Sequence, residues 1–287
     1  MKILITGGSG QLGYHLQKIA VRDDKYQVLS PGSAEFDLAN PKAIESFLTS
    51  NKPDVIINAA AYTAVDKAET EIDLAMAING VAVETLANYS IEQQCPLIQV
   101  STDFVFDGQQ GKPYAPDTRC QPLGVYGESK HLGEQAALRS PYAKVVRTSW
   151  VYSEHGTNFV KTMLRLAAER DQLSVVADQI GSPSYAGNLA QFIWHLIENP
   201  SDQTVLHCSD AGVCSWYDFA HSVFDLASSM GKLKSVPQLT PIRSDEYPTA
   251  AKRPSYSVLD CSESYKSVGL VPQQWREALT VMLEKLN

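Results

Sequence analysis

The stretch Lys2–Gly13, KILITGGSGQLG, decides the fold class. Its first five residues form a short apolar run that is typical of a buried strand, and glycines follow at positions 7, 10 and 13 as a helical pattern begins. The first glycine permits a tight turn, the second lets the backbone approach a pyrophosphate, and the third lets helix and strand pack closely. Free amides at the helix start favour phosphate groups. This order of strand, glycine loop and helix predicts a dinucleotide-binding unit.

Strands and helices alternate through the first half of the chain. Further strands are expected over 26–30, 54–58, 96–101 and 144–150, and helices over 11–21, 73–94, 123–140 and from Pro41, with Asn40 as a cap. Strands separated by helices form right-handed crossovers and a parallel sheet. Near-continuous apolar strands fit a sheet that is covered on both faces. The pattern predicts an α/β fold with a Rossmann-like, doubly wound parallel sheet.

The regular alternation loosens after about residue 150. Helices are expected over 158–169, 186–198, 216–230 and 273–286, joined by connections rich in proline, serine and tyrosine. We predict an NAD(P)-binding Rossmann domain of residues 1–152 with part of 184–208. The remainder, 153–183 and 209–287, is expected to form a smaller, mixed α/β domain that binds substrate.

Composition excludes several classes of protein. The 287 residues are 44% hydrophobic and 20% charged, which suits a large core and argues against disorder. A net charge of −8 argues against nonspecific binding to nucleic acid or to an anionic membrane. No apolar run reaches the roughly 18 residues of a membrane span, and the first residues lack a signal peptide. Five cysteines without a CxxC pair indicate reduced thiols in a cytoplasmic protein rather than a zinc finger or disulfide scaffold.

Tyr126 and Lys130 form a Tyr-x-x-x-Lys motif on an expected helix, where residues four apart share a face. A nearby ammonium lowers the pKa of a phenol, so Tyr126 can act as general acid on a carbonyl oxygen as hydride arrives. Lys130 can also hold a nicotinamide ribose. Thr102 ends the fourth strand, where ligands bind in doubly wound sheets, and would polarise the same carbonyl. The alternative interpretations are a surface helical pair and an ordinary strand-end turn.

The end of the second strand bears on cofactor choice. Residues 28–33, VLSPGS, contain neither a carboxylate for a ribose nor an arginine for a 2′-phosphate. Ser30 and Ser33 can hydrogen-bond the 2′-phosphate of NADPH, and they also tolerate a ribose without this phosphate. The segment therefore favours NADPH and allows NADH. Asp37 comes slightly later and is expected either to face the adenine or to cap a helix.

Several segments together carry a family resemblance: Gly7–Gly13, Asn58–Glu69, Ser101–Gly108, Tyr126–Glu134, Arg147–Tyr152, Asp178–Tyr185 and Ala251–Asp260. In this order they resemble the extended short-chain dehydrogenase/reductase superfamily and, within it, the dTDP-4-dehydrorhamnose reductase family. Ser184 departs from the threonine usual there. The resemblance implies reduction of the C4 ketone of dTDP-4-dehydro-L-rhamnose to dTDP-L-rhamnose by NADPH or NADH, with Tyr126 as general acid.

The resemblance also assigns roles to individual residues. The catalytic positions are Thr102, Tyr126 and Lys130. The cofactor positions are Gly7, Gly10, Gln11, Leu12, Asp37, Leu38, Ala60, Ala61, Tyr62, Tyr126 and Lys130. The substrate positions are Thr63, Val65, Asp103 and Trp150, whose flat indole suits the apolar face of a deoxyhexose or simply fills the core.

Two further substrate residues are suggested by their chemistry. Arg253 can meet a diphosphate bidentately, and Asn158 can hydrogen-bond the substrate. Mg²⁺ is implied by the resemblance alone, and no metal ligand is assigned because the sequence shows no convincing cluster of carboxylates.

Other functions remain open at this stage. An epimerase or dehydratase for another sugar nucleotide needs extra acid–base groups, and Phe104 stands where a dehydratase of Thr-Asp-Glu type has glutamate. A non-catalytic regulatory subunit, like that of methionine adenosyltransferase, also resembles this family, but the intact glycine loop and catalytic trio favour an enzyme. The sequence leaves the oligomeric state open, with a homodimer as one option.

Overall fold

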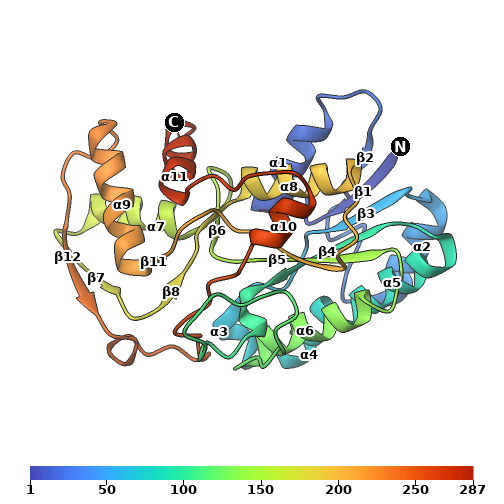
Figure 1. The fold of residues 1–287 in the computed structure, drawn as a ribbon, viewed down its shortest axis with the longest axis horizontal. Coiled ribbons are helices and arrows are strands. Elements are labelled where there is room, and N and C mark those ends of the chain that lie inside the picture. Colours follow the sequence, from blue (N-terminus) through green and yellow to red (C-terminus); the bar gives the residue numbers. More distant parts are fainter. Residues whose placement is uncertain (287) are drawn as a thin grey trace.

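The computed structural model describes residues 1–286, and its centre is a six-stranded sheet in the order β10-β5-β4-β3-β1-β2 (Figure 1). All neighbouring strands pair in parallel. The strands are β1 (Lys2–Thr6), β2 (Gln27–Leu29), β3 (Val55–Asn58), β4 (Leu97–Thr102), β5 (Ala143–Thr148) and β10 (Val205–His207). Strand order reverses at β1, which lies between β2 and β3. The predicted Rossmann-like, doubly wound fold is confirmed.

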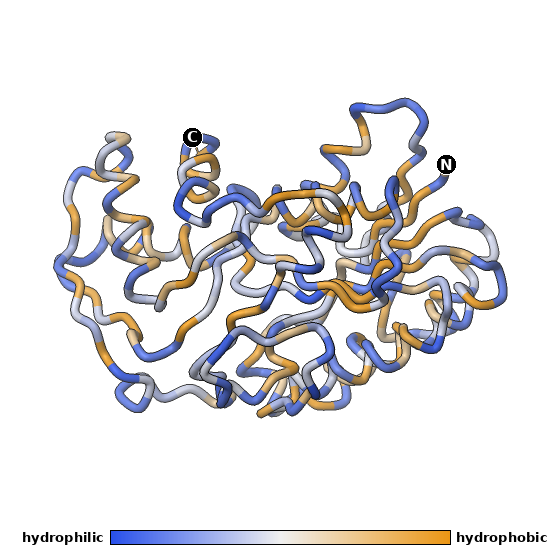
Figure 2. The backbone as a smooth tube through the Cα atoms, viewed as in Figure 1, coloured by the Kyte–Doolittle hydropathy of each residue, from blue (hydrophilic) through white to orange (hydrophobic). Residues whose placement is uncertain are grey.

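Helices cover both faces of this sheet (Figure 1). One face carries α1 (Gln11–Ala20) and α8 (Ala186–Glu198), and the other carries α2 (Pro41–Asn51), α5 (Ala82–Gln93) and α6 (Val125–Ala137). Side chains alternate along a strand, so Ile3 and Ile5 join the apolar cluster under α1 and α8, whereas Leu4 joins the cluster on the other face. Figure 2 shows the hydrophobic colouring of these central strands.

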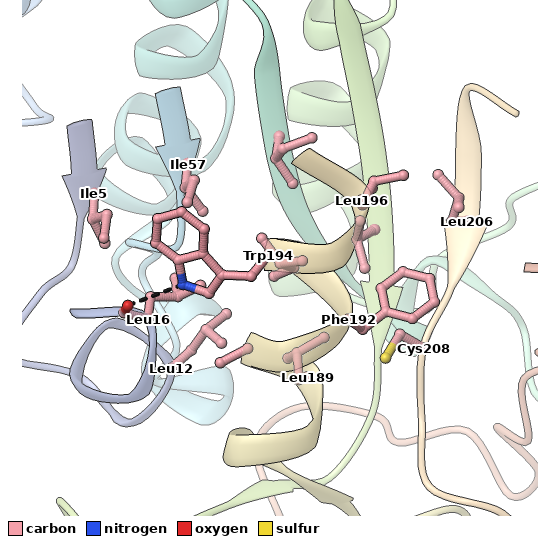
Figure 3. Packing of buried hydrophobic residues seen from close by; sticks show 14 of the residues in the cluster. Ile5, Leu12, Leu16, Ile57, Leu189, Phe192, Trp194, Leu196, Leu206 and Cys208 are labelled. Atoms are coloured by element: carbon pink, nitrogen blue, oxygen red, sulfur yellow. Dashed lines mark hydrogen bonds between the residues drawn. The ribbon is translucent and has the colours of Figure 1, made fainter. Parts of the chain in front are cut away.

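Trp194 of α8 fixes the packing of α8 against α1. Its indole is buried beside Leu12 and Leu16, and its Nε1–H donates to the Leu16 carbonyl oxygen at 3.0 Å (Figure 3). Pairing this donor avoids the cost of an unsatisfied polar group in the core. Trp194 therefore joins α8 to the middle of α1, the helix that follows the glycine loop.

The chain after β5 builds a smaller region, at the left of Figure 1. Its elements are β6 (Val151–Tyr152), α7 (Phe159–Glu169), β7 (Gln172–Val176), β8 (Ile180–Gly181), β9 (Ser184–Tyr185), β11 (Cys214–Ser215), α9 (Trp216–Ser229), β12 (Gln238–Ile242), η3 (Ser244–Glu246) and α11 (Trp275–Glu284). Phe219 and Trp275 lie in its apolar cluster. By contrast, α10 (Ser262–Ser267) places Tyr265 in the cluster beside α8. The domain boundaries given above stay a prediction.

Two elements differ from the expected pattern. The helix expected over 73–94 is divided into α4 (Ile72–Met76), a π-helical turn η1 (Ala77–Val81) and α5, because Asn79 turns inward to bond another loop. The strand expected to reach Trp150 ends at Thr148, and Trp150 adopts a left-handed φ of 46°. No helix in the part of the chain that the structure describes combines the length and the apolar character needed to cross a bilayer.

Candidate active site

The carboxyl ends of β1, β3 and β4 meet at one edge of the sheet, and buried polar side chains tie them together. The Thr6 hydroxyl donates to Asn58 Oδ1 at 2.6 Å, and Asn58 Nδ2 donates to Gln99 Oε1 at 2.7 Å. The backbone N–H of Ala60 donates to Thr6 Oγ1 at 3.0 Å. The loop after β3 is thus held beside the glycine loop, at the switch point where doubly wound sheets bind ligands.

The glycine loop leaves no room for side chains on its inner side. Gly7 has a φ of +66°, and a Cβ there would lie 2.8 Å from Ala60 Cα. A Cβ on Gly13 would lie 2.2 Å from the Gly7 carbonyl oxygen. Gly10 is the N-cap residue of α1, and no side chain within residues 1–286 caps that helix. The first amides of α1 therefore remain available for a phosphate, as predicted.

The first two residues of α1 differ in the groups that they can offer to a cofactor. Leu12 is buried in the cluster beneath α8, so it can offer its backbone N–H but not its side chain to a cofactor. Gln11 Nε2 donates to the Val151 carbonyl oxygen at 3.4 Å, and Gln11 Oε1 accepts from Asn158 Nδ2 at 2.9 Å. Asn158, predicted to bind substrate, thus bonds the glycine-loop helix and also caps α7 by accepting from Lys161 N.

The residues predicted near the adenosine follow β2. Asp37 is exposed, and its Oδ1 accepts the Ala39 N–H at 2.9 Å, which leaves the carboxylate accessible. Leu38 is partly buried against the apolar cluster under α2. Ser30 lies against the glycine loop, because a Cβ on Gly8 would meet its hydroxyl. The serine predicted to contact the cofactor is therefore adjacent to the loop.

Residues 59–64 form the loop between β3 and α3 (Val65–Ala68). The Asn79 side chain accepts the Tyr62 N–H at 2.8 Å and donates to the Tyr62 carbonyl at 3.1 Å, which fixes this loop. A bond to Glu71 raises the pKa of the Tyr62 phenol to about 12. Ala60 and Ala61 are half-buried. Asn79 is a positioning residue that no local pattern in the sequence indicates.

The predicted catalytic trio converges at the end of β4. Thr102 is its last residue, and Tyr126 and Lys130 lie on α6. Burial raises the pKa of Tyr126 to about 12, although a bond with Thr102 opposes this rise. The Lys130 ammonium donates to the Val100 carbonyl oxygen at 2.7 Å, and burial lowers its pKa to about 8. The structure thus differs from the expected lowering of the Tyr126 pKa, because burial and the nearby Asp103 both raise this pKa and only the bond with Thr102 lowers it.

Asp103 begins the 3-10 turn η2 (Asp103–Val105) directly after Thr102. It is only 2% exposed, and its Oδ1 accepts the Thr102 hydroxyl at 2.9 Å. Its Oδ2 has no partner within residues 1–286. Burial raises the pKa of this carboxyl to about 6, although the nearby hydroxyls of Ser257 and Thr102 oppose this rise. The unpartnered oxygen fits the predicted role in holding a polar ligand.

A cleft of about 1120 Å³ opens between α7, α9, β7, β12 and residues 244–253. Trp216 lines it and stacks on Trp150, with ring centroids 3.5 Å apart and planes 6° apart. Leu123 and Lys252 line both this cleft and a small cavity of about 10 Å³ beside Tyr126. The cleft therefore adjoins the small cavity beside Tyr126, the predicted general acid.

Two predicted substrate residues lie at the start of α3: one in the loop before this helix and one as its first residue. Thr63 is exposed, and Val65 lines the small cavity beside Tyr126. Arg253 lines the large cleft, but both its terminal nitrogens donate to the Asp66 carboxylate, at 2.7 and 3.1 Å. The Arg253 guanidinium therefore pairs with a carboxylate in this structure, whereas the sequence predicted a diphosphate as its partner.

A buried ion pair lies one turn beyond Lys130 on α6. Arg147 donates to both carboxylate oxygens of Glu134 at 2.8 Å. Burial raises the pKa of Glu134, but the Arg147 bonds outweigh it and bring the pKa to about 2. Cys120 and His131 place ligand atoms within 4.8 Å of the same carboxylate. The guanidinium already occupies both oxygens, and Mg²⁺ prefers oxygen ligands, so this cluster does not suit that ion.

Comparison with known proteins agrees with this geometry. A family model described as RmlD substrate binding domain matches residues 1–287. The dTDP-4-dehydrorhamnose reductase of Aggregatibacter actinomycetemcomitans is 43% identical over 284 residues, 97% of each chain. A crystal structure of a dTDP-4-dehydrorhamnose reductase from Clostridium acetobutylicum is 38% identical, with a TM-score of 0.93 over 100% of this chain and 99% of that chain.

A second solved structure is the dTDP-4-dehydrorhamnose reductase of Bacillus anthracis in complex with NADP. It is 36% identical, with a TM-score of 0.92 over 99% of each chain. The resemblance stated from the motifs is thus confirmed over the full length. The chain belongs to the RmlD substrate binding domain family.

Proposed function

We propose that this protein reduces the C4 ketone of dTDP-4-dehydro-L-rhamnose to dTDP-L-rhamnose with NADPH or NADH. One observation carries the proposal. The uncapped start of α1, after the glycine loop, lies at the same edge of the sheet as Thr102, Tyr126 and Lys130, and a cleft opens beside them. Full-length relatives named for this activity support it. Oxidation of NADPH or NADH that depends on this sugar nucleotide is the test. A cytoplasmic location and a homodimer stay predictions.

The chemistry assigns one task to each member of the trio. NAD(P)H supplies the hydride when bound. Tyr126 is protonated at neutral pH, since its pKa lies at about 12, and its phenol donates a proton to the C4 oxygen, so that the ketone becomes a secondary alcohol. Thr102 polarises that oxygen with its hydroxyl. The Lys130 ammonium stabilises the phenolate left on Tyr126.

The residues present fit the proposed cofactor. The open amides of α1 and the close approach permitted by Gly10 suit a diphosphate. Ser30 beside Gly8 allows a ribose with or without a 2′-phosphate, and this supports use of both NADPH and NADH.

The surroundings of Tyr126 favour a reductase over a dehydratase. The ring of Phe104 packs edge-on against that of Tyr126, with centroids 5.5 Å apart. An aromatic side chain there supplies no second acid or base, which an elimination beside the carbonyl needs. Asp103 is the neighbouring carboxyl, and we assign it to substrate binding because its Oδ2 has no partner within residues 1–286.

The rate is expected to fall as the pH rises through about 8. Lys130 is an ammonium below this pH and a neutral amine above it, and only the ammonium stabilises the phenolate. We expect kcat at saturating substrates to fall by about tenfold per pH unit above 8. Steady-state assays from pH 6 to 10 check this, with return to pH 7 after incubation as a control for denaturation. A constant kcat up to pH 9.5 would contradict the role of Lys130.

A further inference from the structure

Residues 153–158 join β6 to α7 and contact the glycine loop through His155 as well as through Asn158. His155 Nε2 lies 2.9 Å from the Ser9 carbonyl oxygen, and its ring stacks on Tyr14 with centroids 4.4 Å apart and planes 7° apart. A carbonyl oxygen only accepts hydrogen bonds, so Nε2 carries the hydrogen. The imidazole therefore donates directly to the turn that precedes α1.

A second bond holds the same turn from the same segment. Asn158 Nδ2 donates to Gln11 Oε1 at 2.9 Å and to the Ser153 carbonyl oxygen at 2.6 Å. Ser9 and Gln11 flank Gly10, so the turn is held on both sides of its central glycine.

The segment itself is anchored by a buried network. His15 Nε2 lies 3.0 Å from Ser153 Oγ and 3.3 Å from Glu154 Oε2. The Tyr185 hydroxyl donates to Glu154 Oε2 at 3.0 Å, and Lys285 Nζ donates to the Tyr185 oxygen at 2.8 Å. These contacts join α1, β9 and the end of α11. The segment is therefore a fixed support rather than a free loop.

A glycine loop benefits from such support. Glycine loses more conformational freedom on ordering than any other residue, and Gly7, Gly8 and Gly10 all lie within four residues. No side chain within the described residues caps α1. Gln17 Nε2 donates to the Gly8 carbonyl oxygen at 2.7 Å and the Gly10 N–H donates to the Gly7 carbonyl oxygen at 2.9 Å, but neither bond reaches Ser9, whose carbonyl oxygen is held by His155. Ordering the loop before binding lowers the cost of binding.

We propose that His155 is a positioning residue for the dinucleotide: its bond to the Ser9 carbonyl keeps the amides at the start of α1 aimed at the diphosphate. This rests on the proposed function, in which the glycine loop holds NADPH or NADH. His155 acts through the loop and contacts none of the reacting groups.

His155→Ala tests this with two measurements. Calorimetric titration should show a dissociation constant for NADPH raised about tenfold, the usual effect of losing one hydrogen bond, while kcat at saturating NADPH stays within about twofold. Hydrogen exchange of backbone amides 8–13 in the cofactor-free protein should be faster than in the wild type, and this readout needs no turnover.

Two further variants complete the experiment. His155→Gln keeps an N–H donor and is expected to restore most of the affinity and the slow exchange. His221→Ala, on the exposed side of α9, removes a histidine that touches only surface groups and should change neither quantity.

Specific outcomes would overturn the proposal. Unchanged NADPH affinity and unchanged exchange in His155→Ala would do so. An affinity loss that His155→Gln does not restore, and that accompanies a comparable loss of melting temperature, would assign His155 a merely structural role. Wild-type protein that binds neither NADPH nor NADH would instead refute the proposed function, and the positioning role with it.

Discussion

Replacing Tyr126 with phenylalanine is expected to lower kcat by about 100-fold to 10,000-fold, the contribution of a well-placed general acid. The substitution removes one hydroxyl and keeps the ring that packs against Phe104. The glycine loop is untouched, so the dissociation constant for NADPH should stay within about twofold. Steady-state kinetics with the sugar nucleotide at saturation, together with calorimetric titration of NADPH, measures both quantities.

A matched control distinguishes the loss of a general acid from a general effect of replacing any tyrosine with phenylalanine. Tyr142 lies at the surface before β5 with 38% of its area exposed, and Tyr142→Phe should leave kcat unchanged. If Tyr126→Phe retained a third or more of the wild-type rate, the proton would have to come from another group, and the assignment of Tyr126 would fail.

Replacing Glu134 with alanine is expected to lower the free energy of unfolding by about 3–5 kcal/mol. The side chains of Glu134 and Arg147 are 1% and 5% exposed, and they share two bonds of 2.8 Å. The variant would leave the guanidinium buried without its counterion. Glu134 lies one helical turn beyond Lys130 on α6. Urea denaturation at pH 7, followed by circular dichroism, measures the change.

An exposed pair provides the control for this prediction. Arg165 and Glu169 are four residues apart on α7, with 61% and 50% of their side chains exposed. Glu169→Ala should change the free energy of unfolding by less than about 1 kcal/mol, because water screens and solvates both charges. If both substitutions changed the free energy of unfolding equally, burial would not govern the strength of the Glu134–Arg147 pair.

Local patterns predicted most of the fold and the residues proposed here as the catalytic trio. Apolar runs and helical spacing placed β1, α1, α2 and α8 because those features depend on neighbours a few residues apart. The glycine loop and the spacing of Tyr126 and Lys130 are equally local. Their meeting with Thr102 followed from the rule that parallel strands share one carboxyl edge.

Contacts between residues far apart in the sequence could not be predicted from local patterns. Asp66 and Arg253 are 187 residues apart, and neither position shows that it pairs with the other. The expected strand over 144–150 ends in the apolar Trp150, but Trp150 leaves it to stack on Trp216 of a helix far along the chain. The inward turn of Asn79 similarly depends on the loop at Tyr62, so periodicity predicted an uninterrupted helix.

The central claim is that this chain reduces a keto-sugar nucleotide at C4. The direct measurement supplies purified protein with dTDP-4-dehydro-L-rhamnose and with NADPH or NADH in separate reactions, and follows absorbance and product together. We expect loss of reduced cofactor with equimolar formation of dTDP-L-rhamnose, and no loss without the sugar nucleotide. Binding of both cofactors without consumption of either would contradict the claim and favour a non-catalytic role for the same fold.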